Sequence, residues 1–167
     1  ANYCLTYSPR YAKRASHLLT VSEFSKKDII VTYGLAGDQI SVVYNGASGA
    51  FSPISPEEQQ QGRAKYPGGA PFFHFVGAIH PRKNITSILE AFDAFREKAG
   101  ESVKLLLVGR KGWKYEGALQ VYEQMTHKED VIFTGFVSDE ELRKIYGASL
   151  ALCYVPVFEG FGIPVLE

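Results

Sequence analysis

The sequence is poor in cysteine, methionine and tryptophan, and it carries no net charge. Its two cysteines, Cys4 and Cys153, stand far apart, which favours free thiols in a reducing compartment over a disulfide. The 18 basic and 18 acidic side chains cancel, so no overall field draws the protein to nucleic acid or to an acidic membrane. No apolar run approaches the roughly 20 residues that span a bilayer. These absences exclude a disulfide-stapled scaffold and a general nucleic-acid binder.

Metal-binding patterns and a dinucleotide fingerprint are also absent. The four histidines and two cysteines show no zinc-ligand spacing, and no Asp-x-Asp pair is present to hold a metal–diphosphate complex. No G-x-G-x-x-G follows a strand-like run, which disfavours a nicotinamide-dependent dehydrogenase. We therefore expect no metal site and no cofactor.

The chain alternates strand-like apolar runs with helix-like segments. Strands are predicted at residues 18–21, 40–44, 72–76, 103–108, 131–134 and 150–154, and helices at 23–33, 56–65, 85–98, 115–126 and 139–146. The run LLLVG at 105–109 is apolar on both faces, as in a parallel sheet that helices cover on both sides. The alternation predicts an α/β fold with an open, doubly wound parallel sheet.

Two of these helices carry particular sequence signals. An apolar stripe at helical spacing is formed by Ile85, Ile88, Leu89, Phe92 and Phe95. Asn84 is the expected N-cap of that helix. Ser138, with Glu141 three residues later, predicts a capping box for the helix at 139–146.

The last nine residues, EGFGIPVLE, hold the pattern with the clearest chemical meaning. Glu159 and Glu167 flank Gly160, Gly162 and Pro164. Glycine lets backbone amides approach a ligand, and proline suits the first position of a helix whose free amides attract anions. Carboxylates on both sides of an anion site suit a nucleotide-sugar, which has a diphosphate in its middle and hydroxyls at both ends. Taken alone, the motif is equally consistent with an ordinary loop-to-helix junction.

A second candidate site follows the strand predicted at 72–76. Arg82 and Lys83 place two cations directly before a helix. Positioned cations stabilise the charge that develops on a leaving nucleoside diphosphate without a metal. The other interpretation of these two residues is a solvated basic loop. Arg110 follows the next strand, and it is equally consistent with a ligand contact and with an exposed turn. Ligands of open α/β sheets bind beyond the carboxyl ends of the strands, so these loops are expected to share a cleft.

Six blocks of the chain resemble, in order, the retaining family-four glycosyltransferases (glycosyl transferases group 1), which have the two-domain GT-B architecture. The blocks are HLLTVSEFSKKDII, ISVVYNG, FFHFVGAIHPRKNI, LLLVGRKGW, VIFTGFVSDEELRKIY and EGFGIPVLE. Together they span nearly the whole chain, which makes the resemblance specific. It implies a GT-B type, Rossmann-like doubly wound parallel sheet that is truncated.

The resemblance also implies a domain organisation. Residues 1–45 are similar to the tail of the N-terminal, acceptor-side domain, and 72–167 to an incomplete C-terminal, donor-binding domain. Residues 46–71, rich in Gly, Pro, Ser and Gln, are the expected interdomain linker. A final helix of only four residues, from Pro164 to Glu167, cannot bury a face. We therefore expect this sequence to be a fragment that is inactive by itself.

The resemblance further implies roles for single residues. Glu159 would contact the transferred sugar and would act as a catalytic residue together with Arg82 and Lys83, which bind the diphosphate. Glu167 would accept hydrogen bonds from the ribose diol. The remaining donor-binding residues would be Gly77, Gly135, Phe136, Val137, Phe161, Gly162 and Ile163. For Phe136 and Phe161, core packing is the alternative. Many relatives have arginine where this chain has Ala78. The positive charge that binds the diphosphate is therefore expected to come mainly from Arg82 and Lys83.

The implied function is the retaining transfer of a hexose from a nucleotide diphosphate sugar to a saccharide or lipid-linked acceptor. The block VGAIHPRKN resembles mannosyltransferases of surface-polysaccharide pathways, which favours GDP-mannose over a UDP-hexose. No nucleic-acid partner is expected. The location is expected to be cytoplasmic, with peripheral association at the inner face of the membrane left open. The alternatives are a non-catalytic nucleotide-sugar-binding module and a GT-B nucleotide-sugar epimerase, which product analysis with and without an acceptor distinguishes.

Overall fold

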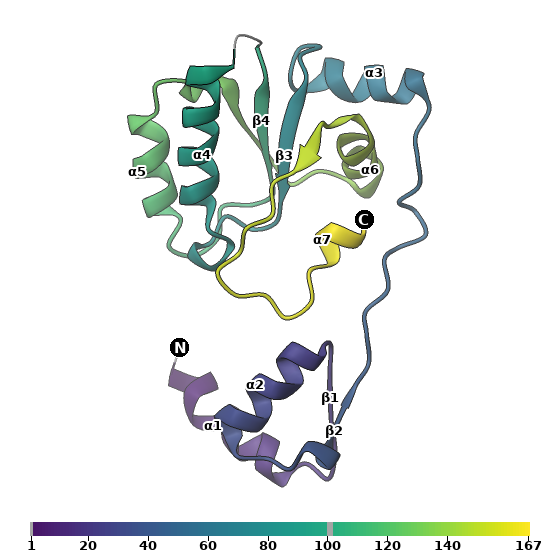
Figure 1. Ribbon diagram of the computed structural model, residues 1–167, viewed down its shortest axis with the longest axis vertical. Coiled ribbons are helices and arrows are strands. Elements are labelled where there is room, and N and C mark those ends of the chain that lie inside the picture. The colour runs from purple at the N-terminus through teal and green to yellow at the C-terminus, as the bar shows by residue number, and fades with distance from the viewer. Residues whose placement is uncertain (1, 100–101) are drawn as a thin grey trace. The chain divides into compact units, whose positions relative to one another are not determined.

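The computed structural model describes residues 2–99 and 102–167, which form two compact units (Figure 1). The first unit contains the residues up to Ala47 and the segment Glu159–Leu166. The second contains Ser48–Phe158 and Glu167. Both units are built from parallel strands and helices, as the alternation in the sequence predicts.

The first unit is centred on a parallel pair of strands, β1 (Leu18–Thr20) and β2 (Ile40–Val42), joined through α2 (Glu23–Tyr33). The helix α2 begins at Ser22, whose hydroxyl accepts a hydrogen bond from the Ser25 N–H at 3.0 Å. The other elements of this unit are α1 (Asn2–Arg14), η1 (Gly37–Gln39) and α7 (Ile163–Leu166).

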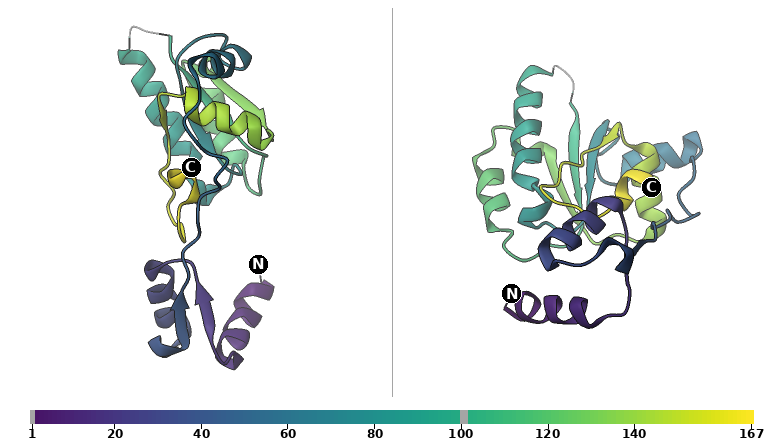
Figure 2. Two further views of the ribbon diagram at one scale, coloured as in Figure 1. Left: turned by 90° about the vertical axis from the view of Figure 1, so that its right-hand side faces the viewer. Right: turned by 60° about the horizontal axis from the view of Figure 1, so that its bottom comes forward.

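The second unit is a four-stranded parallel sheet in the order β5-β4-β3-β6. Its strands are β3 (Phe72–Val76), β4 (Lys104–Val108), β5 (Val131–Gly135) and β6 (Ala151–Leu152). Its helices are α3 (Pro56–Lys65), α4 (Ile85–Lys98), α5 (Glu116–Gln124) and α6 (Asp139–Ala148), with short turns η2 (Pro81–Lys83) and η3 (Lys128–Asp130). Figures 1 and 2 show α4 and α5 on one face of the sheet and α3 and α6 on the other.

The central strand β4 supplies side chains to two separate cores. Leu105 and Leu107 pack with residues of α4 and α5, while Leu106 and Val108 pack with residues of α6. All four are buried. Successive side chains of a strand point to opposite faces, so a continuous apolar run fits a strand covered on both sides. The expected doubly wound sheet is therefore confirmed.

Most predicted elements occur close to their expected bounds. The N-terminal helix α1 is not among the predicted elements, and it contains Pro9, a residue that ordinarily disrupts a helix. Asn84 is the N-cap residue of α4, as predicted, but its backbone lies in the left-handed region, with φ 57°, and its side chain makes no capping hydrogen bond. The side-chain oxygen of Asn84 accepts a hydrogen bond from the Ser87 hydroxyl at 2.9 Å instead. The capping box of Ser138 is confirmed.

The stretch 46–71, predicted as a linker, contains α3, which packs against α6. A Cβ added to Gly62 would lie 3.0 Å from the Ala148 Cβ, so the two helices are close. The Arg63 Nε donates to the Ala148 carbonyl at 3.1 Å, and Glu58 forms an ion pair with Arg143. The helix α3 thus belongs to the second unit. The assignment of 1–45 and 72–167 to two domains of a longer enzyme stays a prediction.

Of the two cysteines, Cys153 is a half-buried free thiol, and burial raises its pKa. The side chain of Cys4 lies outside the described part of the structure.

A histidine lies in the core of the second unit. His74, in β3, is 1% exposed, and neither ring nitrogen has a hydrogen-bond partner among the described residues. Its ring makes an edge-to-face contact with Tyr146 of α6 at a centroid distance of 4.6 Å. Burial disfavours the charged imidazolium and lowers the pKa of His74 to about 4. The side chain is therefore neutral at pH 7.

This burial predicts a loss of stability in mild acid. The unfolded chain takes up a proton on His74 below about pH 6.5, whereas the folded protein does so only near the lowered pKa. The free energy of unfolding should therefore fall by roughly 2–3 kcal/mol between about pH 7 and about pH 4.5. Urea unfolding across this range measures the loss. The His74→Leu variant should lose much less over the same range, and an unchanged slope in this variant would contradict the assignment.

Candidate functional site

Glycine marks the carboxyl ends of three neighbouring strands in the second unit. Gly77 follows β3, Gly109 follows β4 and Gly135 ends β5, with φ values of 142°, 141° and 71°. The Gly77 N–H donates to the Val108 carbonyl and the Gly109 N–H to the Gly135 carbonyl, both at 2.9 Å. A Cβ on Gly109 would lie 2.1 Å from the Gly77 oxygen. This edge of the sheet is therefore lined by closely packed backbone.

Lys83 lies next to the glycine that follows β3. The position that a Cβ of Gly77 would occupy is 3.8 Å from the Lys83 Cε. The Lys83 Nζ is 5.6 Å from the centroid of the Tyr154 ring. The turn that carries Lys83 is held by His80, whose Nδ1 accepts a hydrogen bond from the Arg82 N–H at 3.2 Å. A cation therefore lies close to the carboxyl end of β3, where an open α/β sheet binds its ligand.

Arg82 is exposed and connects two loops. Its Nη1 donates to the Phe158 carbonyl, and its own carbonyl accepts from the Val157 N–H, both at 2.9 Å. The Asn84 Nδ2 donates to the Val155 carbonyl at 3.1 Å. The loop after β3 is thus hydrogen-bonded to the segment after β6, its neighbour in the sheet. Arg82 has a structural role in addition to its predicted contact with phosphate.

The turn after β5 separates Phe136 from Val137. Phe136 is 71% exposed, with the Arg110 guanidinium 5.0 Å from its ring centroid. Core packing of Phe136, the alternative weighed from the sequence, is therefore wrong. Val137 is buried in the core that contains Val108 and Ile145, so only its backbone remains for a ligand. Arg110 and Phe136 form a cation–π pair at the carboxyl edge of the sheet.

The carboxylate of Glu167 accepts a hydrogen bond from the Tyr146 hydroxyl at 2.9 Å. Both residues line a cavity of about 280 Å³ together with Phe51 and Arg143. Burial is the main cause that raises the pKa of Tyr146, and the hydrogen bond to Glu167 adds to it. The phenol therefore stays protonated at neutral pH and donates to the carboxylate.

The rest of the C-terminal motif belongs to the first unit. The Gly160 carbonyl accepts hydrogen bonds from the hydroxyls of Ser22 at 2.5 Å and Ser25 at 3.3 Å. Phe161 is half-buried, with its ring 6.1 Å from that of Tyr44. The remaining predicted residues of this segment are Glu159, Gly162 and Ile163, with Gly162 at φ 97°. Pro164 is the second residue of α7, so this helix begins one residue earlier than predicted.

The structure therefore divides the predicted site residues between the units. The second unit holds Gly77, Arg82, Lys83, Gly135, Phe136, Val137 and Glu167, and the first holds Glu159, Phe161, Gly162 and Ile163. Sequence reasoning did not identify Tyr146 or Ser22 as partners of the motif. Both lie inside sequence blocks singled out above, HLLTVSEFSKKDII and VIFTGFVSDEELRKIY. Their polar side chains at helix ends were the available signal.

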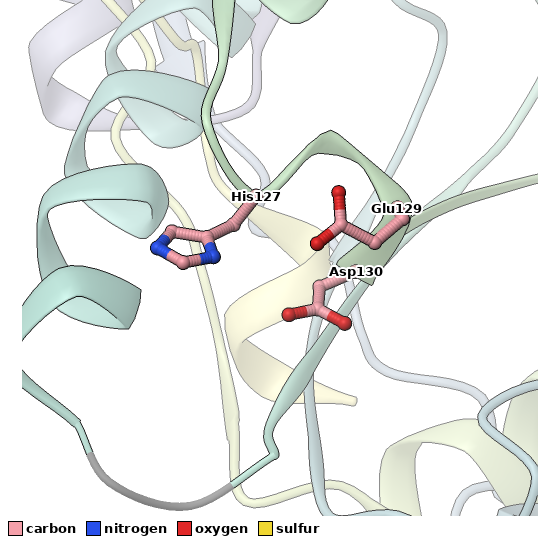
Figure 3. Close-up of side chains that lie close together, drawn as sticks. All are labelled: His127, Glu129 and Asp130. Atoms are coloured by element: carbon pink, nitrogen blue, oxygen red, sulfur yellow. The ribbon is translucent and has the colours of Figure 1, made fainter.

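One set of side chains among the described residues has the grouping of metal ligands. The ligand atoms of His127, Glu129 and Asp130 lie within 4.8 Å of one another (Figure 3). Asp130 is buried and already paired with Arg96 at 2.8 Å and Lys104 at 2.5 Å. Burial opposes its ionisation, but these two cations outweigh that effect and lower the pKa of Asp130. The cluster precedes β5, at the opposite end of the strand from Gly135, and we interpret its buried member Asp130 as the centre of an ion-pair network with Arg96 and Lys104.

Comparison with known proteins identifies relatives. The family model described as glycosyl transferases group 1 matches residues 56–167. O-antigen chain mannosyltransferase B of Escherichia coli is 30% identical over 177 residues, covering 98% of this chain and 46% of that protein. O-antigen chain mannosyltransferase RfbU of Salmonella typhimurium is 33% identical over 156 residues, covering 93% and 40%. The chain thus spans less than half the length of these curated relatives.

Solved structures share the fold at low sequence identity. Anabaena Alr3699/HepE, crystallised with UDP and glucose, superposes with a TM-score of 0.79 at 18% identity, over 97% of this chain and 44% of that one. WaaG, a glycosyltransferase involved in lipopolysaccharide biosynthesis, superposes with a TM-score of 0.74 at 20% identity, over 99% and 47%. These likenesses confirm the GT-B fold expected from the sequence.

Because the edge of the sheet is closely packed, a glycine-to-alanine replacement there should destabilise the protein much more than one on an open surface. In Gly109→Ala, the new Cβ meets the Gly77 carbonyl and the backbone keeps a positive φ. We therefore expect the free energy of unfolding to fall by roughly 3 kcal/mol or more. Gly117→Ala is the matched control, since nothing lies within 4 Å of its Cβ position in α5. The control should be neutral or stabilising by up to about 1 kcal/mol. Denaturant unfolding compares the two, and equal effects would refute the close contact.

Proposed function

Because the chain belongs to the glycosyl transferases group 1 family, we propose that it is part of a retaining hexosyltransferase that uses a nucleotide diphosphate sugar. The observation that carries the proposal is the position of Lys83 beside Gly77, at the carboxyl end of β3. An ammonium group next to glycine backbone suits a diphosphate, which needs both charge and close approach.

Two cations would stabilise the leaving group. As the bond between the sugar and the diphosphate breaks, negative charge develops on the phosphate oxygens. Lys83 and Arg82 would balance that charge without a metal ion, and the backbone of Gly77 would leave room for the phosphates. Arg82 can do this while bound to Phe158, because a guanidinium has several N–H donors.

The two carboxylates of the motif would serve opposite ends of the donor. Glu167 would accept hydrogen bonds from the ribose diol, and Glu159 would contact the transferred sugar. Phe161, Gly162 and Ile163 would offer backbone amides to the sugar and β-phosphate, and Gly135, Phe136 and Val137 backbone groups to the nucleobase. The leaving phosphate would assist attack by the acceptor on the same face of the sugar, so that the product keeps the α configuration.

We propose mannose as the transferred hexose, carried by GDP, and a saccharide or lipid-linked acceptor. The two relatives described above, at 30% and 33% identity, are both mannosyltransferases of O-antigen chains. One structural neighbour was crystallised with UDP and glucose, so UDP-hexoses are the alternative donors to be tested. Calorimetric titration of the complete enzyme with GDP-mannose, UDP-glucose and UDP-galactose decides between them. Product analysis with and without an acceptor distinguishes the transferase from an epimerase and from a non-catalytic binding module.

The cellular site of the reaction is part of the proposal. In the described part of the chain, no helix has the length and apolar character needed to cross a bilayer. We propose that the complete enzyme takes its nucleotide-sugar from the cytoplasm and meets its acceptor at the inner face of the membrane.

The phosphate-binding role is tested by single replacements. In the complete enzyme, Lys83→Ala should weaken nucleoside diphosphate binding by about 1–3 kcal/mol, the range for a lost charged hydrogen bond. Arg82→Ala should do the same and also loosen the segment that ends at Phe158. Lys111→Ala, which removes an exposed cation whose Nζ lies 5.4 Å from the centroid of the Tyr115 ring, is the control. Nucleoside without phosphates should bind as before, and an equal loss for the nucleoside would show that the effect is structural.

The roles of the carboxylates predict different kinetic effects. Glu167→Ala should weaken the donor and free nucleoside diphosphate alike. Glu159→Gln should reduce kcat far more than nucleoside diphosphate affinity, because Glu159, unlike Glu167, would face the transferred sugar, whose charge and shape change in the transition state. Both variants must melt within a few degrees of the parent. Full turnover in Glu159→Gln would mean that the motif has been interpreted wrongly.

A further inference from the structure

Tyr146 is the side chain that holds the Glu167 carboxylate. Its hydroxyl donates to the Glu167 Oε2 at 2.9 Å, and both residues belong to the second unit. Arg143 lines the same cavity but forms its ion pair with Glu58. A carboxylate accepts about four hydrogen bonds, so the bond from Tyr146 leaves acceptor capacity for a ligand.

The ring of Tyr146 is fixed by contacts on two sides. Phe51 packs edge-to-face at a centroid distance of 5.3 Å and an interplanar angle of 76°. His74 does the same at 4.6 Å and 78°. The backbone of α6 is held next to this ring, because Gly147 packs so closely on Ile54 that a Cβ would lie 2.5 Å from the Ile54 Cγ1. The phenol oxygen therefore has a defined position relative to the sheet.

A fixed donor orients a flexible acceptor. A glutamate side chain has three rotatable bonds, and ordering it costs conformational entropy that a ligand must otherwise supply. A hydrogen bond from a rigid phenol selects one carboxylate orientation before the ligand arrives. Hydrogen bonds of this kind to ligand-binding groups typically change affinity by about 10–100-fold in metal sites.

We propose that Tyr146 is a positioning residue that pre-orients Glu167 for the ribose diol of the nucleotide. The proposal rests on the proposed function, since it takes from there the role of Glu167 in ribose binding. Tyr146 itself touches no ligand in this account, and its contribution is transmitted entirely through the Glu167 carboxylate.

The test compares nucleotides with and without the diol on the same protein. Tyr146→Phe removes only the hydroxyl and keeps the ring between Phe51 and His74. In the complete enzyme, GDP and 2′,3′-dideoxy-GDP are titrated by calorimetry, with the corresponding UDP pair in parallel. We expect Tyr146→Phe to weaken the diol-containing nucleotide about tenfold and to leave the dideoxy analogue unchanged. The ratio of the two affinities is independent of how much of the variant is folded.

Three further variants make the result specific. Glu167→Ala should remove the preference for the diol, and the double variant with Tyr146→Phe should be no weaker than Glu167→Ala alone. Tyr122→Phe, which removes a hydroxyl from a half-buried tyrosine of α5, should change neither affinity. Equal losses for both nucleotides in Tyr146→Phe, or no loss for GDP and UDP, would overturn the proposal. If Glu167→Ala leaves the preference for the diol intact, the proposed role of Glu167 fails as well.

Discussion

At the carboxyl edge of the sheet, the carbonyl oxygen of Gly77 occupies the place where a side chain on Gly109 would stand. This backbone contact brings the ends of β3 and β4 together without side chains between them. The loops that follow begin from this edge, including the turn that carries Arg82 and Lys83. The candidate phosphate-binding group therefore depends on two glycines that would contact no substrate through a side chain.

Much of the second unit could be predicted from the sequence because its signals are local. The apolar run in β4 predicts a strand covered on both faces, and the structure divides its four residues between two cores. The capping box of Ser138 needs only a partner three residues away. The bounds predicted for α2, α3 and α4 agree with those of the structure.

Other features depend on contacts between residues that are distant in the sequence. The side-chain amide of Asn84 is bound to the Val155 carbonyl, 71 residues later, which no pattern around Asn84 reveals. Phe136 is exposed beside Arg110 because the loops after β4 and β5 are adjacent, and hydrophobicity alone would bury it. The bond between Tyr146 and Glu167 joins a helix end to the final residue of the sequence. For the candidate site, sequence motifs therefore identify individual residues, while the contacts between them require the fold.

The hydrogen bond from Arg82 to the Phe158 carbonyl has a consequence for which amino acids this position tolerates. A planar guanidinium offers five N–H donors in a fixed geometry, so one side chain can bind a backbone carbonyl and an anion at the same time. Lysine has the same charge, but its compact ammonium group on a flexible stem lacks the planar fork that holds several N–H donors in fixed directions. In the proposed phosphate site, position 82 would therefore select for side-chain shape as well as charge, whereas position 83 would need only a positive charge that reaches Gly77.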